Sequence, residues 1–122
     1  MNKYKALNNW FNQFGIPFYL DTNVPSEKEI EYPYGTYQSV IGNWTDEASI
    51  AVRVYDRSNK EIRINKFVDS LAEQLKHGTM VLCDEGAMHL TAGSPFCQAI
   101  TDKEDRTIRS RYINVNIEYL IM

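Results

Sequence analysis

The sequence has only two cysteines and two histidines among its 122 residues. Cys83 and Cys97 lie inside apolar runs, so we expect a buried, reduced pair rather than a disulfide. His77 suits the negative end of a helix dipole, and His89 falls on the polar side of a possible strand. No CxxC, HxxxH or HExxH spacing connects these residues. The sequence therefore predicts no catalytic centre and no metal site.

Other features that the sequence lacks narrow the class of protein further. There is no basic excess, and a net charge of −3 argues against a dedicated nucleic-acid binder. The glycines are scattered singly and none opens a helix within a glycine-rich loop, which argues against a cofactor phosphate site. No apolar run approaches the roughly 20 residues that cross a membrane, and the N-terminus does not resemble a signal peptide. We expect a protein of cytoplasmic origin with no cofactor and no membrane contact.

Tyrosine, in contrast, is abundant and supplies eight of the fifteen aromatic residues. A tyrosine ring can be buried while its hydroxyl still finds a partner, so the residue serves both cores and interfaces. The surplus indicates assembly. The apolar fraction of 43% and the charged fraction of 24% are ordinary for a soluble globular protein. The length predicts a single domain, residues 1–122, that can bury a real core.

The stretch from Ala48 to Gly78 predicts the centre of this core. Apolar residues alternate along 48–55, as they do in a strand with one buried face. A polar turn follows, and the apolar spacing then changes to three and four, which predicts an amphipathic helix. Ser58 can cap this helix, with Glu61 completing a capping box, and Gly78 can end it. The apolar stripe of the helix consists of Ile64, Phe67, Val68, Leu71, Ala72 and Leu75.

The N-terminal third predicts a second helix and an aromatic edge segment. Leu7, Trp10, Phe11 and Phe14 make a helical stripe that ends at Gly15. Residues 16–20 fit a short strand or an extended linker, and residues 21–30 a loop. The run of residues 32–37 begins with a proline-containing segment that belongs at a strand start or on an edge, and residues 35–44 are β-like.

The C-terminal third predicts strands. Residues 80–83 fit a short buried strand, 84–86 a turn, and 92–95 a break in the chain. Residues 96–119 fit a long hairpin with a charged tip at 102–106, and strict alternation marks a strand over about 107–121. Arg109 and Arg111 share one side of that strand. They could reach a phosphate or a neighbour's carboxylate, but we favour a solvated face paired with Asp or Glu across the sheet.

This order of elements predicts an α+β fold. Strands that are adjacent in sequence favour a mostly antiparallel sheet, with the two helices packed on one face and the long hairpin at the C-terminus.

The same order resembles the siphophage tail terminators, also called tail completion or minor capsid proteins. The resemblance covers Trp10 to Leu120. It rests on the N-terminal helix, the segment from Tyr32 to Tyr37, the strand 50–55, the helix 62–76 and a last hairpin whose long strand includes 113–119. The segment from Asp84 to Gly93 carries no landmark of the family.

The resemblance implies a homo-oligomeric ring, commonly a hexamer, in the neck of the virion, made from subunits produced in the host cytoplasm. Such a ring would cap the tail tube protein, meet the head-side connector protein and let DNA pass through its lumen without specific binding. A closed ring needs two different patches on each subunit. An acidic chain also suits a channel for a polyanion.

We expect the subunit contacts in two places. The first is the aromatic edge segment, with Tyr32, Tyr34, Tyr37 and Trp44. The second is the charged hairpin tip, which consists of Asp102, Lys103, Glu104, Asp105 and Arg106. Alternatively, half of the aromatic residues complete the core and the tip is a solvated loop.

Three other functions fit the sequence. A head-tail adaptor or stopper, or a tail tube subunit, stays within virion assembly, and a tube subunit should form long tubes. A small enzyme would show an apolar pocket with converging polar groups. A ligand-binding or protein-binding α+β module would be monomeric.

Overall fold

The computed structural model describes residues 1–26, 28–38, 47–58, 60–101 and 107–121. The described elements, in order, are α1 (Lys3–Asn12), β1 (Phe18–Leu20), β2 (Tyr34–Tyr37), β3 (Glu47–Arg57), α2 (Ile62–Leu75), β4 (Thr79–Cys83), β5 (Gly86–Thr101) and β6 (Ile108–Ile121). The fold class is α+β, as predicted. No helix in these ranges has the length and apolar character needed to span a membrane.

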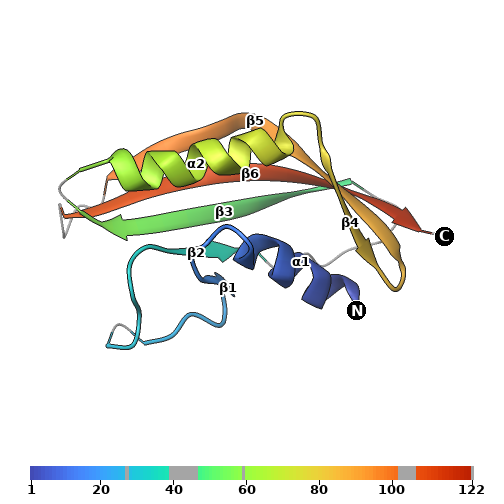
Figure 1. Cartoon of the computed structure of the whole chain (residues 1–122), viewed down its shortest axis with the longest axis horizontal. Coiled ribbons are helices and arrows are strands. Elements are labelled where there is room, and N and C mark those ends of the chain that lie inside the picture. The colour runs from blue at the N-terminus through green and yellow to red at the C-terminus, as the bar shows by residue number, and fades with distance from the viewer. Residues whose placement is uncertain (27, 39–46, 59, 102–106, 122) are drawn as a thin grey trace.

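The six strands form one sheet in the order β1-β2-β3-β6-β5-β4 (Figure 1). Every neighbouring pair is antiparallel except β1 and β2, which run parallel. The long β5–β6 pair confirms the predicted C-terminal hairpin, although its tip lies outside the described residues. The predicted short strand at residues 16–20 is β1, and its parallel pairing was not predicted.

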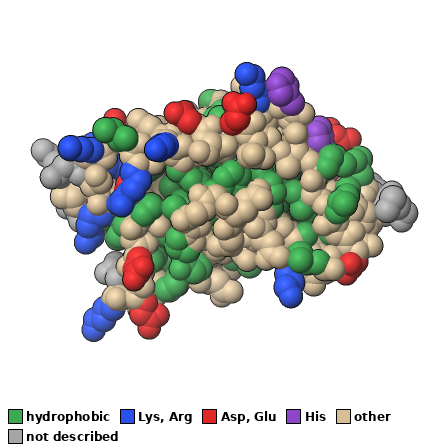
Figure 2. Space-filling model, in the orientation of Figure 1, with side chains coloured by type: hydrophobic (Ala, Val, Ile, Leu, Met, Phe, Trp, Pro, Cys, Tyr) green, Lys and Arg blue, Asp and Glu red, His purple; other side chains and the backbone are tan. Residues whose placement is uncertain are grey.

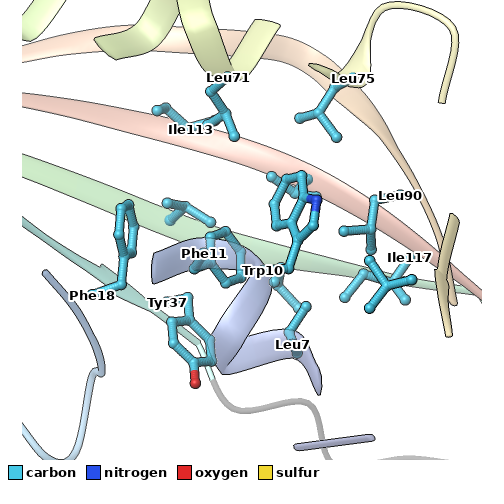
Figure 3. Close-up of a cluster of buried hydrophobic side chains, with 14 of the residues drawn as sticks. Leu7, Trp10, Phe11, Phe18, Tyr37, Leu71, Leu75, Leu90, Ile113 and Ile117 are labelled. Atoms are coloured by element: carbon cyan, nitrogen blue, oxygen red, sulfur yellow. The ribbon is translucent and has the colours of Figure 1, made fainter. Parts of the chain in front are cut away.

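Both helices lie against the same face of the curled sheet. Helix α2 contacts β3, β5 and β6, whereas α1 contacts β1 and β4, the two edge strands (Figure 1). Figure 3 shows Phe11 of α1 next to Phe18 and Tyr37, and Trp10 in the middle of the cluster, while Leu71 of α2 lies above Ile113. All eight elements contribute buried residues to this core.

Alternation in the strands follows from this one-sided packing. Ile50, Val52 and Val54 of β3 are at most 2% exposed, and their neighbours Ile113 and Val115 on β6 are fully buried. The period-two pattern of the sequence therefore predicted the buried side of both strands correctly.

Helix α2 has the predicted apolar stripe but a later start. Ile64, Phe67, Leu71 and Leu75 are buried, as expected. The predicted capping box is wrong: the N-cap residue is Glu61, and its side chain makes no capping hydrogen bond. Gly78 has a φ of 81°, and its N–H donates to the Leu75 carbonyl (3.2 Å), so it ends the helix as predicted.

Two predictions for β4 and β5 are wrong. The predicted break at residues 92–95 does not interrupt β5, which instead has an irregular register between Ala92 and Cys97. A Cβ atom on Gly93 would lie 2.7 Å from the Cβ of Asn114, so only glycine fits there. Strand β4 was expected to be buried, but it is an edge strand: Val81 points inward, whereas Leu82 is 77% exposed.

Candidate functional site on the helix-free sheet face

The side of the sheet opposite the helices carries the polar and aromatic residues of the central strands. On β3 these are the odd-numbered residues, including Arg53 and Tyr55, because their even-numbered neighbours point into the core. The register places Arg53 beside Tyr112 of β6 and Tyr55 beside Tyr34 of β2. Both described helices pack on the opposite side of the sheet, so neither of them covers these side chains.

Four tyrosines cluster at one end of this face. Tyr34 stacks on Tyr55 with ring centroids 5.0 Å apart, and Tyr32 meets Tyr34 edge-on at 5.4 Å. Tyr19 of β1 lies 6.4 Å from Tyr34. Aromatic rings at these centroid distances attract one another in tilted, edge-on or stacked arrangements. The rings therefore present an ordered surface from β1, β2, β3 and the segment before β2.

Two arginines extend this cluster with positive charge. The Arg57 guanidinium lies 5.0 Å from the Tyr32 ring centroid, and the Arg53 guanidinium lies 5.5 Å from that of Tyr112. Cation–π contacts of this length orient an arginine without neutralising its charge. We call the set Tyr19, Tyr32, Tyr34, Arg53, Tyr55, Arg57 and Tyr112 the tyrosine face.

A groove of about 500 Å³ crosses the tyrosine face. It is lined by Asp21, Val24, Tyr34, Thr36, Gln38, Ala51, Arg53, Tyr55 and Tyr112. Aromatic rings, amide and hydroxyl groups and one charge of each sign can together hold a partner's side chains through apolar contact and hydrogen bonds.

The predicted aromatic contact residues divide between this face and the core. Tyr32 and Tyr34 lie on the tyrosine face, as described. Tyr37 is only 3% exposed: its ring stacks on Phe11 at 4.7 Å, and its hydroxyl accepts a hydrogen bond from Asn8 Nδ2 (2.8 Å). Burial raises the pKa of Tyr37, and the bond from Asn8 opposes this rise. Tyr37 thus has no free surface to offer a second subunit.

The remaining predicted contacts, Trp44 and residues 102–106, lie outside the described residues, and their roles stay predictions. Five members of the tyrosine face were not predicted as contact residues: Tyr19, Arg53, Tyr55, Arg57 and Tyr112. The signal for Arg53 and Tyr55 was present in the sequence, because both occupy the polar positions of the alternating strand 48–55.

The two arginines that share one side of β6 point toward the helices. Arg111 is 7% exposed and lies 3.4 Å from Glu61, while Arg109 lies 3.8 Å from the same carboxylate. The predicted pairing with an acidic residue is therefore confirmed, but its place is wrong: the partner is Glu61, which precedes α2, and not a residue across the sheet, and Arg111 is buried rather than solvated. Figure 2 shows other Lys and Arg side chains at this end of the molecule, where β3 ends and α2 begins.

A second ion pair lies beside this one. Asp56 is fully buried, and the Arg63 guanidinium donates to both of its carboxylate oxygens. Bidentate geometry of this kind satisfies a buried carboxylate within the fold. We therefore assign this pair to stability and not to the candidate site.

The cysteines are both free and half-buried. Burial raises the pKa of the Cys97 thiol, partly offset by the charge of Arg111. Within the described ranges, no three His, Cys, Asp or Glu side chains come close enough to hold a metal ion.

Comparisons with protein-family models, with curated proteins and with solved structures found no match to this chain.

Proposed function

We propose that this protein is a structural subunit that associates with copies of itself into a closed ring. The tyrosine face carries this proposal, because it is an ordered, helix-free aromatic surface with two oriented arginines. Aromatic residues and arginine are the residue types enriched at protein interfaces and at their hot spots. In this proposal the protein carries out no reaction.

The resemblance to siphophage tail terminators supplies the setting of the proposal. The ring, commonly of six subunits in that family, would cap the tail tube protein in the virion neck and present its other side to the head-side connector. DNA would pass through the lumen without specific binding, which suits a net charge of −3.

The test measures the mass of the purified full-length protein by light scattering and images it by electron microscopy. We expect closed rings of one size. The variant Tyr34→Ser/Tyr55→Ser should remain folded but lose the rings, because it removes the central stacked pair. Tyr4→Ser is the matched control, because Tyr4 is 60% exposed on α1 and lies away from the tyrosine face. Rings that survive in the double variant would contradict the proposed contact surface.

The same images separate the related virion roles. A tail tube subunit should form long filaments, whereas a terminator should stop at the ring. An adaptor or stopper should also close into a ring but should bind the head-side connector without capping purified tail tubes.

The groove on the tyrosine face also supports a second candidate function, a module that binds a small ligand. A volume of about 500 Å³ lies within the range of ligand sites. A protein of this kind should remain monomeric at all concentrations and should be stabilised by a bound compound. Screening a library of small molecules by thermal unfolding, with Arg53→Ala as the groove variant, tests this alternative.

A further inference from the structure

The end of the helix-free face away from the tyrosine cluster carries negative charge. Glu47 of β3 pairs in register with Glu118 of β6, which in turn pairs with His89 of β5. With Thr91, Asn116 and Ile117 they line a groove of about 290 Å³, which we call the acidic groove. The two glutamates lie directly opposite each other, and both are exposed.

These carboxylates are poorly compensated within the chain. Like charges directly opposite each other across a sheet repel. Among the described residues, no Lys or Arg pairs with Glu47, and the side chain that meets the Glu118 carboxylate is the His89 imidazole, whose Nδ1 lies 3.9 Å away. A cation supplied from outside would therefore relieve the repulsion and be held by two carboxylates.

An apolar rim lies next to the acidic groove. Leu82, Ala87 and Leu120 are neighbours in one row across β4, β5 and β6. Leu82 is 77% exposed and Leu120 is 40% exposed, and Met80, in the row of Glu118, is 50% exposed. Exposed apolar side chains grouped beside charges are typical of a surface that meets another protein.

The tyrosine face has the complementary composition. Arg53 is exposed and held above Tyr112, and among the described residues no carboxylate pairs with it. Arg53 and Glu47 lie six positions apart on β3, on the same side of the sheet, which corresponds to about 20 Å. One face of this chain therefore has an aromatic, basic end and an aliphatic, acidic end.

We propose that the tyrosine face of one copy docks on the acidic groove of the next, with Arg53 reaching the carboxylates of Glu47 and Glu118. The tyrosine rings then cover the apolar rim around Leu82. This inference rests on the proposed ring and names its second contact surface. Two different, complementary patches on each subunit are what a head-to-tail ring requires.

Charge reversal tests the contact on the full-length protein. The acidic-groove variant is Glu47→Lys/Glu118→Lys, which keeps the internal repulsion but changes its sign. The tyrosine-face variant is Arg53→Glu/Arg57→Glu. Each alone should raise the dissociation constant for self-association at least tenfold, and a Glu73→Lys control on the exposed side of α2 should not. Thermal unfolding establishes that all variants are folded.

Mixing the two variants shows whether the reversed charges meet each other across the contact. An equimolar mixture should assemble again, because every contact between the two variants then joins opposite charges: lysines meet glutamates where both surfaces are reversed, and arginines meet glutamates where both are unchanged. The chain that carries all four reversals should assemble by itself for the same reason. Added salt should weaken both assemblies and that of the parent protein. If the mixture and the fourfold variant stay dissociated, or if the acidic-groove variant assembles like the parent, the proposed contact is wrong.

The outcomes separate this inference from the proposed function. If the parent forms rings and both charge-reversal variants form the same rings, the proposed ring stands and the proposed contact is wrong. A parent that forms two-fold dimers or filaments, sensitive to both reversals and restored by mixing, would support the contact and overturn the ring. A parent that is monomeric at all concentrations would overturn both.

Discussion

The Asn12 side chain pairs with the outer edge of β1 at Phe18. Its Oδ1 accepts from the Phe18 N–H (2.9 Å), and its Nδ2 donates to the Phe18 carbonyl (3.3 Å). The Leu20 carbonyl on the same edge accepts from the Asn23 N–H (2.9 Å). Unpaired strand edges invite pairing with other chains, so these bonds protect β1.

Replacing Asn12 by alanine should lower the free energy of unfolding by about 1–2 kcal/mol, because the Phe18 groups lose both partners. Urea unfolding measures this change, and Gln13→Ala, an exposed neighbour, is the control. Hydrogen exchange should also quicken at the Phe18 amide. An unchanged midpoint would show that water replaces the asparagine without cost.

Tyr37 makes stability sensitive to alkaline pH. Its folded pKa is raised above the ordinary value of 10.0 by burial. Below pH about 10 the tyrosine is neutral in both states; above it the unfolded chain ionises first and is favoured. We expect the free energy of unfolding to fall as pH rises above 10, and to fall less in Tyr37→Phe. Urea titrations at pH 8 and pH 11 provide the comparison. Burial also raises the pKa of Tyr119, so Tyr119 accounts for the part of the fall that remains in Tyr37→Phe. Equal losses in the parent and Tyr37→Phe would contradict this assignment.

At the residue scale, sequence patterns alone could not separate the interface tyrosines from the core tyrosine. Tyr34 and Tyr37 lie on opposite sides of β2, and both positions are aromatic. Alternation predicts sides only when one side is polar, and here Gly35 and Thr36 give no such contrast. The register with β3 places Tyr37 beside the buried Val52, and this pairing determines that Tyr37 is the core tyrosine.

At the scale of the elements, α2 was predictable in its apolar stripe and unpredictable at its start. The stripe depends on spacing within the helix itself. The start depends on the rest of the fold: the Ser58 N–H donates to the Thr107 carbonyl (2.9 Å), and Glu61 faces Arg109 and Arg111. These partners are about 50 residues away in sequence, so no local capping rule includes them.

Leu71→Ala should lower the free energy of unfolding by about 2–5 kcal/mol, because Leu71 is fully buried between α2 and the sheet. Glu73→Ala, on the exposed side of the same helix, should change stability by less than about 0.5 kcal/mol. Thermal or urea unfolding measures both. A melting curve for Leu71→Ala that matches the parent would show that the stripe is not core.

For the whole molecule, α1 connects the two edges of the curled sheet. It contacts β1 at one edge and β4 at the other, and its Trp10 and Phe11 are buried in the shared core. The sequence predicted a helix that covers the sheet, but not that this helix spans from one edge to the other. That relation depends on the curl of the sheet, which no local pattern encodes.

Removing residues 1–13 should therefore lower the free energy of unfolding by more than the burial of one helix's apolar side chains accounts for. Both edge strands lose their cover, so we expect a broad, weakly cooperative transition and binding of a hydrophobic dye. Trp10→Ala in the full chain is the milder test and should cost about 3–5 kcal/mol. Calorimetry measures both. A sharp transition in the shortened chain would show that the sheet holds its curl without α1.

The position of α1 has a consequence for how the protein is made in the cell. During translation, α1 is made before every strand of the sheet, yet it packs against β4, and its Trp10 and Phe11 share the core with Ile117 of β6, the last of these strands to be made. Its aromatic side chains must therefore stay exposed until the strands of the sheet have emerged. We expect the nascent protein to depend on holding chaperones until β6 has emerged, and to acquire its native core only then.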